Sequence, residues 1–117
     1  MIHIALHVAV PLFAALVLYR SQWPSAFVVL MATMAVDADH LLADPIYDPE
    51  RCSIGFHPLH TTPAIAVYVV LFALPLVLLV GSDAERWGRW LRLARIVHLV
   101  GAGLLIHMAL DGADCFL

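Results

Sequence analysis

The sequence predicts an all-α fold: an integral membrane bundle of four transmembrane helices in a single domain, residues 1–117. Three observations predict it. Apolar residues make up 63% of the chain, well above the about 45–50% of soluble proteins, so lipid must cover much of the apolar surface. Four apolar stretches approach the roughly 17–25 residues that a bilayer-spanning helix needs. With 117 residues there is room for one domain and no second catalytic module.

The elements follow from where the apolar stretches begin and end. The predicted spans are, in order, about 4–19, 24–42, 63–80 and 93–110. The first span is a little short for a bilayer. Pro24 and Pro63 stand at the start of the second and third spans, where a missing backbone N–H costs nothing. A polar loop over residues 43–62 joins these two spans and is called the outer loop below.

The arginines orient the bundle. One side of the predicted membrane carries only Arg51, and the other side carries Arg20, Arg86, Arg89, Arg92 and Arg95. The positive-inside rule makes the arginine-rich side cytoplasmic, so the expected topology is N-out and C-out. We expect a multi-pass protein of a bacterial inner (plasma) membrane, with the outer loop facing the periplasm or exterior. Its partners would be membrane lipid; a homo-oligomer stays open, and the net charge of −3 argues against nucleic acid.

The polar residues that bind metals or move protons gather at one end of the predicted helices. They are His3, His7, Asp37, Asp39, His40, His57, His60, His107, Asp111 and Asp114. Each is costly to place near lipid, so their concentration predicts a site. At about 1.5 Å per residue, His7, His40 and His107 lie roughly 18–24 Å above the cytoplasmic edge and share one layer. His98 lies deeper, and we expect it to be a hydrogen-bonded packing residue.

Three short motifs supply the candidate metal ligands. His107 and Asp111 are four residues apart and share a helix face. Asp37 and His40 point together, whereas Asp39 lies on another face, so one aspartate would share the ion of His40 and the other would orient an imidazole or act as general base. The full predicted ligand set is His7, Asp37, Asp39, His40, His57, His60, His107 and Asp111.

The outer loop adds a cation and a cysteine. Arg51 suits an anionic substrate group because its guanidinium is planar, and an ion pair with Asp48 or Glu50 is an equal alternative. Cys52 and Cys115 both face the oxidising side of the predicted topology, where a disulfide between them is open to formation.

These motifs resemble the YdjM-like family of small membrane-bound, metal-dependent hydrolases. The resemblance covers essentially the whole chain and is carried by ATMAVDADHLLADPIYDPERCSIGFHPLHTT and by LLIHMALDGADCF. A looser similarity links the chain to zinc-dependent phospholipase C and the P1-type nucleases, and it implies that Asp111 bridges two ions. Those enzymes carry a second histidine-rich set after the HxxxD pair, which is not found here, so one or two ions are expected instead of three. The ligands that this similarity implies are His7, Asp37 or Asp39, His57 or His60, His107 and Asp111.

The expected function is therefore a membrane-embedded, metal-dependent hydrolase acting on a lipid-borne ester or phosphoester. Zinc is the default ion for a His and Asp ligand set. Its catalytic residues would be Asp37 or Asp39 as general base and Arg51 as the anion-binding group. The alternative is a metal or proton transporter, or a metal sensor, that uses the same His and Asp cluster.

Overall fold

The computed structural model describes residues 1–81 and 84–116, and of residues 84–87 only the backbone. No strand occurs among these residues, and the prediction of an all-α helical bundle is confirmed. The helices, in chain order, are α1 (Ile2–Leu18), η1 (Arg20–Gln22), α2 (Trp23–Ala32), η2 (Thr33–Leu42), η3 (Pro58–His60), α3 (Thr62–Gly81) and α4 (Ala84–Phe116). Below, the outer end of the bundle is the end that carries the outer loop, and the inner half is the half that carries η1.

Three helical segments are long and apolar enough to cross a membrane: Arg20–Leu42, Thr62–Gly81 and Gly88–Phe116. Helix α1 is a shorter apolar helix of 17 residues. The described part of the predicted arginine-rich connection is helical from Ala84, so α4 is longer than the sequence suggested. The side chain of Arg86, used above to orient the bundle, lies outside the described residues.

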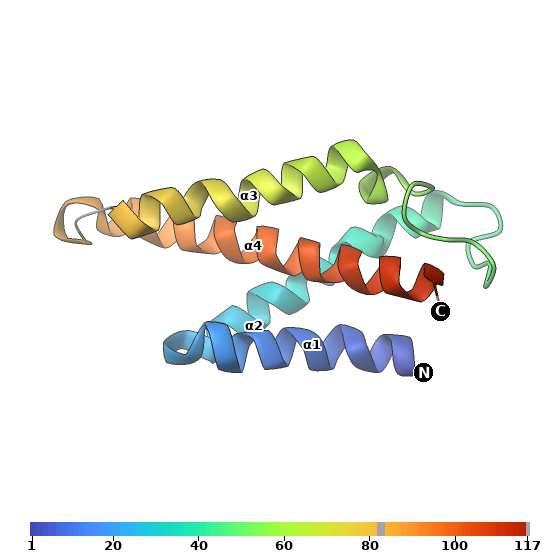
Figure 1. Ribbon diagram of the computed structural model, residues 1–117, viewed down its shortest axis with the longest axis horizontal. Coiled ribbons are helices and arrows are strands. Elements are labelled where there is room, and N and C mark those ends of the chain that lie inside the picture. The colour runs from blue at the N-terminus through green and yellow to red at the C-terminus, as the bar shows by residue number, and fades with distance from the viewer. Residues whose placement is uncertain (82–83, 117) are drawn as a thin grey trace.

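Helix α4 is the centre of the fold. It has 33 residues, and at about 1.5 Å per residue it runs nearly the full 51 Å length of the molecule. Figure 1 shows α3 along one side of α4, with α1 and α2 on the other side. Because η2 also contacts α4, every helix that carries a candidate ligand meets the one that carries His107 and Asp111, apart from the short η3.

Two glycines let α4 approach its neighbours closely. A side chain at Gly101 would overlap the backbone of Leu71 and Phe72 in α3. A side chain at Gly103 would overlap the side chain of Thr33, where η2 begins. Small residues at helix contacts allow such close packing in apolar surroundings. The two contacts hold α4 between α3 and the start of η2.

The second predicted span changes its helix type halfway. Residues 33–42 form a 3-10 helix instead of the expected α-helix, and Thr33 Oγ donates to Leu30 O over 2.6 Å at the junction. A hydroxyl bonded back to the preceding turn bends a helix. Since a 3-10 helix has about three residues per turn, Asp37 and His40 are directly aligned and Asp39 is about 120° away.

The inner half of the bundle is packed with small apolar side chains. Its buried core consists of Ala14, Ala15, Ala26, Leu30, Leu99 and Ala102. The buried His98 is the polar exception: its Nδ1–H donates to Phe72 O over 2.8 Å, and its Nε2 accepts from Tyr19 Oη over 2.7 Å. Both ring nitrogens are therefore satisfied, as expected for a packing histidine.

Candidate metal centre

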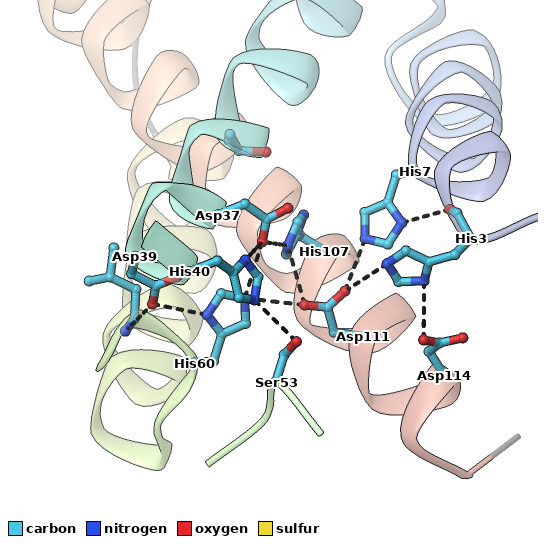
Figure 2. A network of polar contacts seen from close by, with 12 residues as sticks. His3, His7, Asp37, Asp39, His40, Ser53, His60, His107, Asp111 and Asp114 are labelled. Carbon is cyan, nitrogen blue, oxygen red and sulfur yellow. Dashed lines mark hydrogen bonds and ion pairs between the residues drawn. The ribbon is translucent and has the colours of Figure 1, made fainter. Parts of the chain in front are cut away.

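Histidine and aspartate side chains from four segments meet at the outer end of the bundle (Figure 2). They come from α1, η2, α4 and the segment made of His57 and η3. Burial of such groups costs free energy unless they are paired or bind a metal. The buried members are His7, Asp39, His57, His60, His107 and Asp111.

Four of these side chains form the first group: Asp37, His60, His107 and Asp111. Each offers one ligand atom, and all four atoms lie within 4.8 Å of one another. His107 Nε2 is 2.9 Å from Asp37 Oδ1, and His60 Nε2 is 3.1 Å from Asp111 Oδ2. Two imidazole nitrogens and two carboxylate oxygens are a donor set that zinc binds tetrahedrally.

The orientation of the donors fits a cation. His60 Nε2 and Asp111 Oδ2 are buried and form no hydrogen bond, although they are only 3.1 Å apart. The Nδ1–H of His60 donates to Asp39 Oδ2 over 3.2 Å, so the neutral ring carries its lone pair on Nε2. A carboxylate that orients a ligand histidine in this way is usual in metal sites. The residues present therefore fit a divalent ion.

A second group consists of His3, His7 and Asp111, whose ligand atoms also lie within 4.8 Å of one another. His7 Nε2 is 3.2 Å and His3 Nε2 is 3.5 Å from Asp111 Oδ1. His7 Nδ1–H donates to His3 O over 2.9 Å, so its buried Nε2 carries the lone pair. Asp111 thus turns one oxygen to each group, so it could bridge two ions if both groups held one.

A third group consists of Asp39, His40 and His57. Its members form more contacts with other protein groups than the members of the first two groups do. Asp39 Oδ2 accepts from the backbone N–H of Leu59 over 2.8 Å as well as from His60. His40 bonds Ser53 Oγ over 3.2 Å, and the His57 ring lies 3.9 Å from the His40 ring. The sequence did not decide whether Asp37 or Asp39 is the ligand. In the structure Asp37 belongs to the first group, whereas Asp39 lies behind the His60 ring.

The loop histidines have opposite pKa shifts. Burial lowers the pKa of His60, but the surrounding carboxylates of Asp111, Asp37 and Asp39 outweigh it and raise the pKa to about 10. Burial and the neighbouring His40 lower the pKa of His57. In the metal-free protein, His60 therefore holds a proton among carboxylates, and a bound cation would take the place of that proton.

A polar cavity of about 680 Å³, called the vestibule below, leads to the groups from outside. Its walls are the start of α1, residues 46–53 of the outer loop and the end of α4. A disulfide between Cys52 and Cys115 joins the loop to α4. The sequence analysis had allowed this disulfide without deciding on it. The vestibule is also lined by Asp111, His40 and His57. Since Asp111 belongs to the first and second groups and the two histidines to the third, all three groups can be reached from it.

Arg51 also lines the vestibule, but part of its guanidinium serves the loop. Its Nη1 donates to Pro45 O over 2.7 Å, its Nη2 lies 3.8 Å from Asp48 Oδ2, and its Cζ lies 4.5 Å from the centre of the Phe56 ring. The ion pair with Asp48 that the sequence suggested is thus present. An anion-binding role for Arg51 would use the face that it turns to the vestibule.

Sequence reasoning did not include His3 among the ligands, or Ser53 in the site at all. His3 was part of the predicted cluster but not of the predicted ligand set, yet its Nε2 lies 3.5 Å from Asp111 Oδ1. Its spacing of four residues from His7 was the available signal. Ser53 had no signal, because its contact with His40 depends on the path of the outer loop.

Comparison with known protein families places residues 1–83 in a family described only as a family of unknown function, DUF6122. The chain belongs to the DUF6122 family. The matched segment includes both histidines of α1 and all candidate ligands of η2 and the outer loop, and it ends before α4. No curated protein and no solved structure matches the chain.

Proposed function

We propose that this protein is a membrane-embedded, metal-dependent hydrolase that acts on a lipid-borne ester or phosphoester. In this proposal the four apolar helices span a bacterial inner membrane with both termini outside. The metal centre then lies near the outer membrane–water boundary, and the vestibule opens to the periplasm or exterior. The resemblance to the YdjM-like hydrolases agrees with this function.

The strongest support for a metal centre comes from the first group. Two of its buried ligand atoms, His60 Nε2 and Asp111 Oδ2, face each other without a hydrogen bond. A buried imidazole nitrogen and a buried carboxylate oxygen are costly to place side by side unless a proton or a metal cation lies between them. Zinc suits the donor set best, and manganese, iron and nickel also accept it. The bridging position of Asp111 supports a second ion at His3 and His7.

Residues of the first group would hold a divalent ion, which would supply Lewis acidity for an ester or phosphoryl oxygen and activate water as a nucleophile near neutral pH. Asp37 is the better general base of the two aspartates, since its side chain is 37% exposed while that of Asp39 is 3% exposed. In that role Asp37 would not be a ligand, and His60, His107 and Asp111 would hold the ion with a fourth position open for water. Asp39 instead holds the His60 ring in position. Arg51 would hold an anionic group of the substrate in the vestibule.

The transporter hypothesis has less support. A transport path needs polar groups that continue through the inner half. The core there is built of alanine and leucine, and the buried His98 is bonded on both nitrogens. A flux of metal into proteoliposomes through the wild-type protein would favour transport over hydrolysis.

Elemental analysis of the purified protein tests the metal centre. We expect one or two equivalents of zinc or a related metal in the wild type, and loss of metal in His107→Ala and Asp111→Ala. Glu50→Gln, an exposed carboxylate of the outer loop, is the matched control and should keep the metal. A metal-free wild type, or histidine and aspartate variants with full metal, would contradict the assignment.

Hydrolysis is tested separately with ester and phosphoester lipids in mixed micelles. We expect turnover that a chelator abolishes and zinc restores. Metal without turnover of any such lipid would leave a metal protein but refute the hydrolase.

A further inference from the structure

An apolar groove of about 430 Å³ runs along the outside of α4 between α2–η2 and α3. Its floor is Val100 and Leu104 of α4. One wall includes Val28 and Ala32 of α2, and the other is Tyr68 of α3. Figure 1 shows α2 and α3 diverging away from the outer loop.

The groove has no free polar group. Thr33 and Tyr68 are its two hydroxyl residues: Thr33 Oγ donates to Leu30 O over 2.6 Å, and Tyr68 Oη donates to Leu59 O over 2.8 Å. A polar ligand would lose its water here without gaining a partner. The lining therefore selects a hydrocarbon.

The size of the groove fits a single alkyl chain better than a helix of a second copy. A helix is about 10–12 Å across and rises about 5.4 Å per turn, so a volume of about 430 Å³ holds about one turn of it. An extended alkyl chain is only as wide as one side chain, and the same volume holds a long part of it.

Three residues that line the groove stand close before members of the first group along the chain, each on a different element. Val36 precedes Asp37 in η2, Leu59 precedes His60 in η3, and Leu104 lies one turn before His107 in α4. Leu59 also donates its backbone N–H to Asp39. A chain in the groove would thus have its outer end beside the candidate ligands.

We propose that this groove binds one alkyl chain of the lipid substrate and thereby brings its ester or phosphoester bond to the first group. The inference rests on the proposed function, including membrane embedding. It makes the enzyme selective for substrates with a long hydrocarbon chain, because chain burial adds free energy of binding with each methylene group.

Photolabelling tests the groove without any need for turnover. The wild-type protein is reconstituted in vesicles of phosphatidylethanolamine and phosphatidylglycerol that contain a phospholipid with a diazirine in one acyl chain. We expect labelled peptides from Val28–Val36 and Val100–Leu104. Ala32→Phe and Val28→Phe should reduce this labelling about tenfold, the loss expected when roughly two methylene groups are no longer buried.

Val70→Phe is the matched control, because Val70 is an exposed apolar residue of α3 that does not line the groove. It should label as the wild type does, and all variants should keep their helix content and metal. Equal labelling of every exposed apolar position would overturn the proposal, and so would crosslinking of the groove to a second copy.

The kinetic test separates this inference from the proposed function. With a hydrolase in hand, Ala32→Phe should raise KM for a long-chain lipid about tenfold and leave a short-chain ester unchanged. Equal effects on both substrates would refute the groove and leave the hydrolase. Groove labelling in a protein without metal or turnover would refute the hydrolase and leave a lipid site.

Discussion

Two buried histidines, His98 in the inner half and His60 at the outer end, use their ring nitrogens differently. His98 has a hydrogen-bond partner on each nitrogen, Phe72 O and Tyr19 Oη. His60 uses Nδ1 for Asp39 and turns Nε2 toward two further carboxylates without a hydrogen bond to either. A packing histidine satisfies both nitrogens, whereas a candidate ligand uses one nitrogen for orientation and leaves the other to a cation.

The largest effect is expected at Asp111, because it faces both groups. Asp111→Asn should reduce metal affinity by more than the about 10–100-fold that loss of an orienting partner costs. The matched control on the same helix is Asp114→Asn, whose side chain is 63% exposed and contacts only His3 among the described ion pairs. Since an exposed pair is worth up to about 1 kcal/mol, the control should change affinity less than about fivefold. Metal titration in detergent measures both, and equal losses would contradict the special position of Asp111.

A smaller effect is expected at Asp39, which accepts a hydrogen bond from His60 but does not belong to the first group. Asp39→Asn should lower metal affinity about 10–100-fold while the stoichiometry at saturation stays unchanged. The thermal stability of the chelated protein shows whether Asp39 has only a structural role, because such a role would not depend on metal. If that stability falls and the affinity does not, Asp39 is not a positioning residue.

His98→Leu tests the packing histidine of the comparison, and it should lower stability without changing metal binding. It leaves Phe72 O and Tyr19 Oη without their partner, and this should lower the free energy of unfolding by about 1–3 kcal/mol. Metal content should remain that of the wild type. Loss of metal in this variant would mean that the two halves are not independent.

The smallest effect is a pH dependence of the chelated protein. The pKa of His60 is raised to about 10 without metal, so its protonation stabilises the fold fully below about 6.5 and this contribution is lost as the pH rises through 10. A metal-loaded protein has no such loss. The stability gap between loaded and chelated protein should therefore widen from pH 7 to 10, and calorimetry at pH 7 should detect proton release on metal binding. A constant gap would contradict a protonated His60.

Much of the architecture can be predicted from the sequence, since apolar length and helix rise bring His7 and His107 to one level. The α-helical assumption was wrong for residues 33–42, because the Thr33 back-bond and the 3-10 form depend on packing against α4. That packing also decides that Asp37 faces the first group while Asp39 lies behind His60.

The outer loop was the least predictable part of the site. His57 and His60 are three residues apart, yet they belong to different groups. Their places depend on η3 and on Ser53 and Cys52, whose partners lie on η2 and α4. Contacts between segments far apart in the chain leave no periodic signal.

The central position of α4 sets the order in which the protein can be completed during synthesis. The helix is made after α1, α2 and α3, yet it supplies His107, Asp111 and the cysteine that fastens the outer loop. A nascent chain that has not yet released α4 can form neither of the first two groups. Under the proposed function, metal could therefore bind only at a late stage of biogenesis, after α4 has entered between its neighbours.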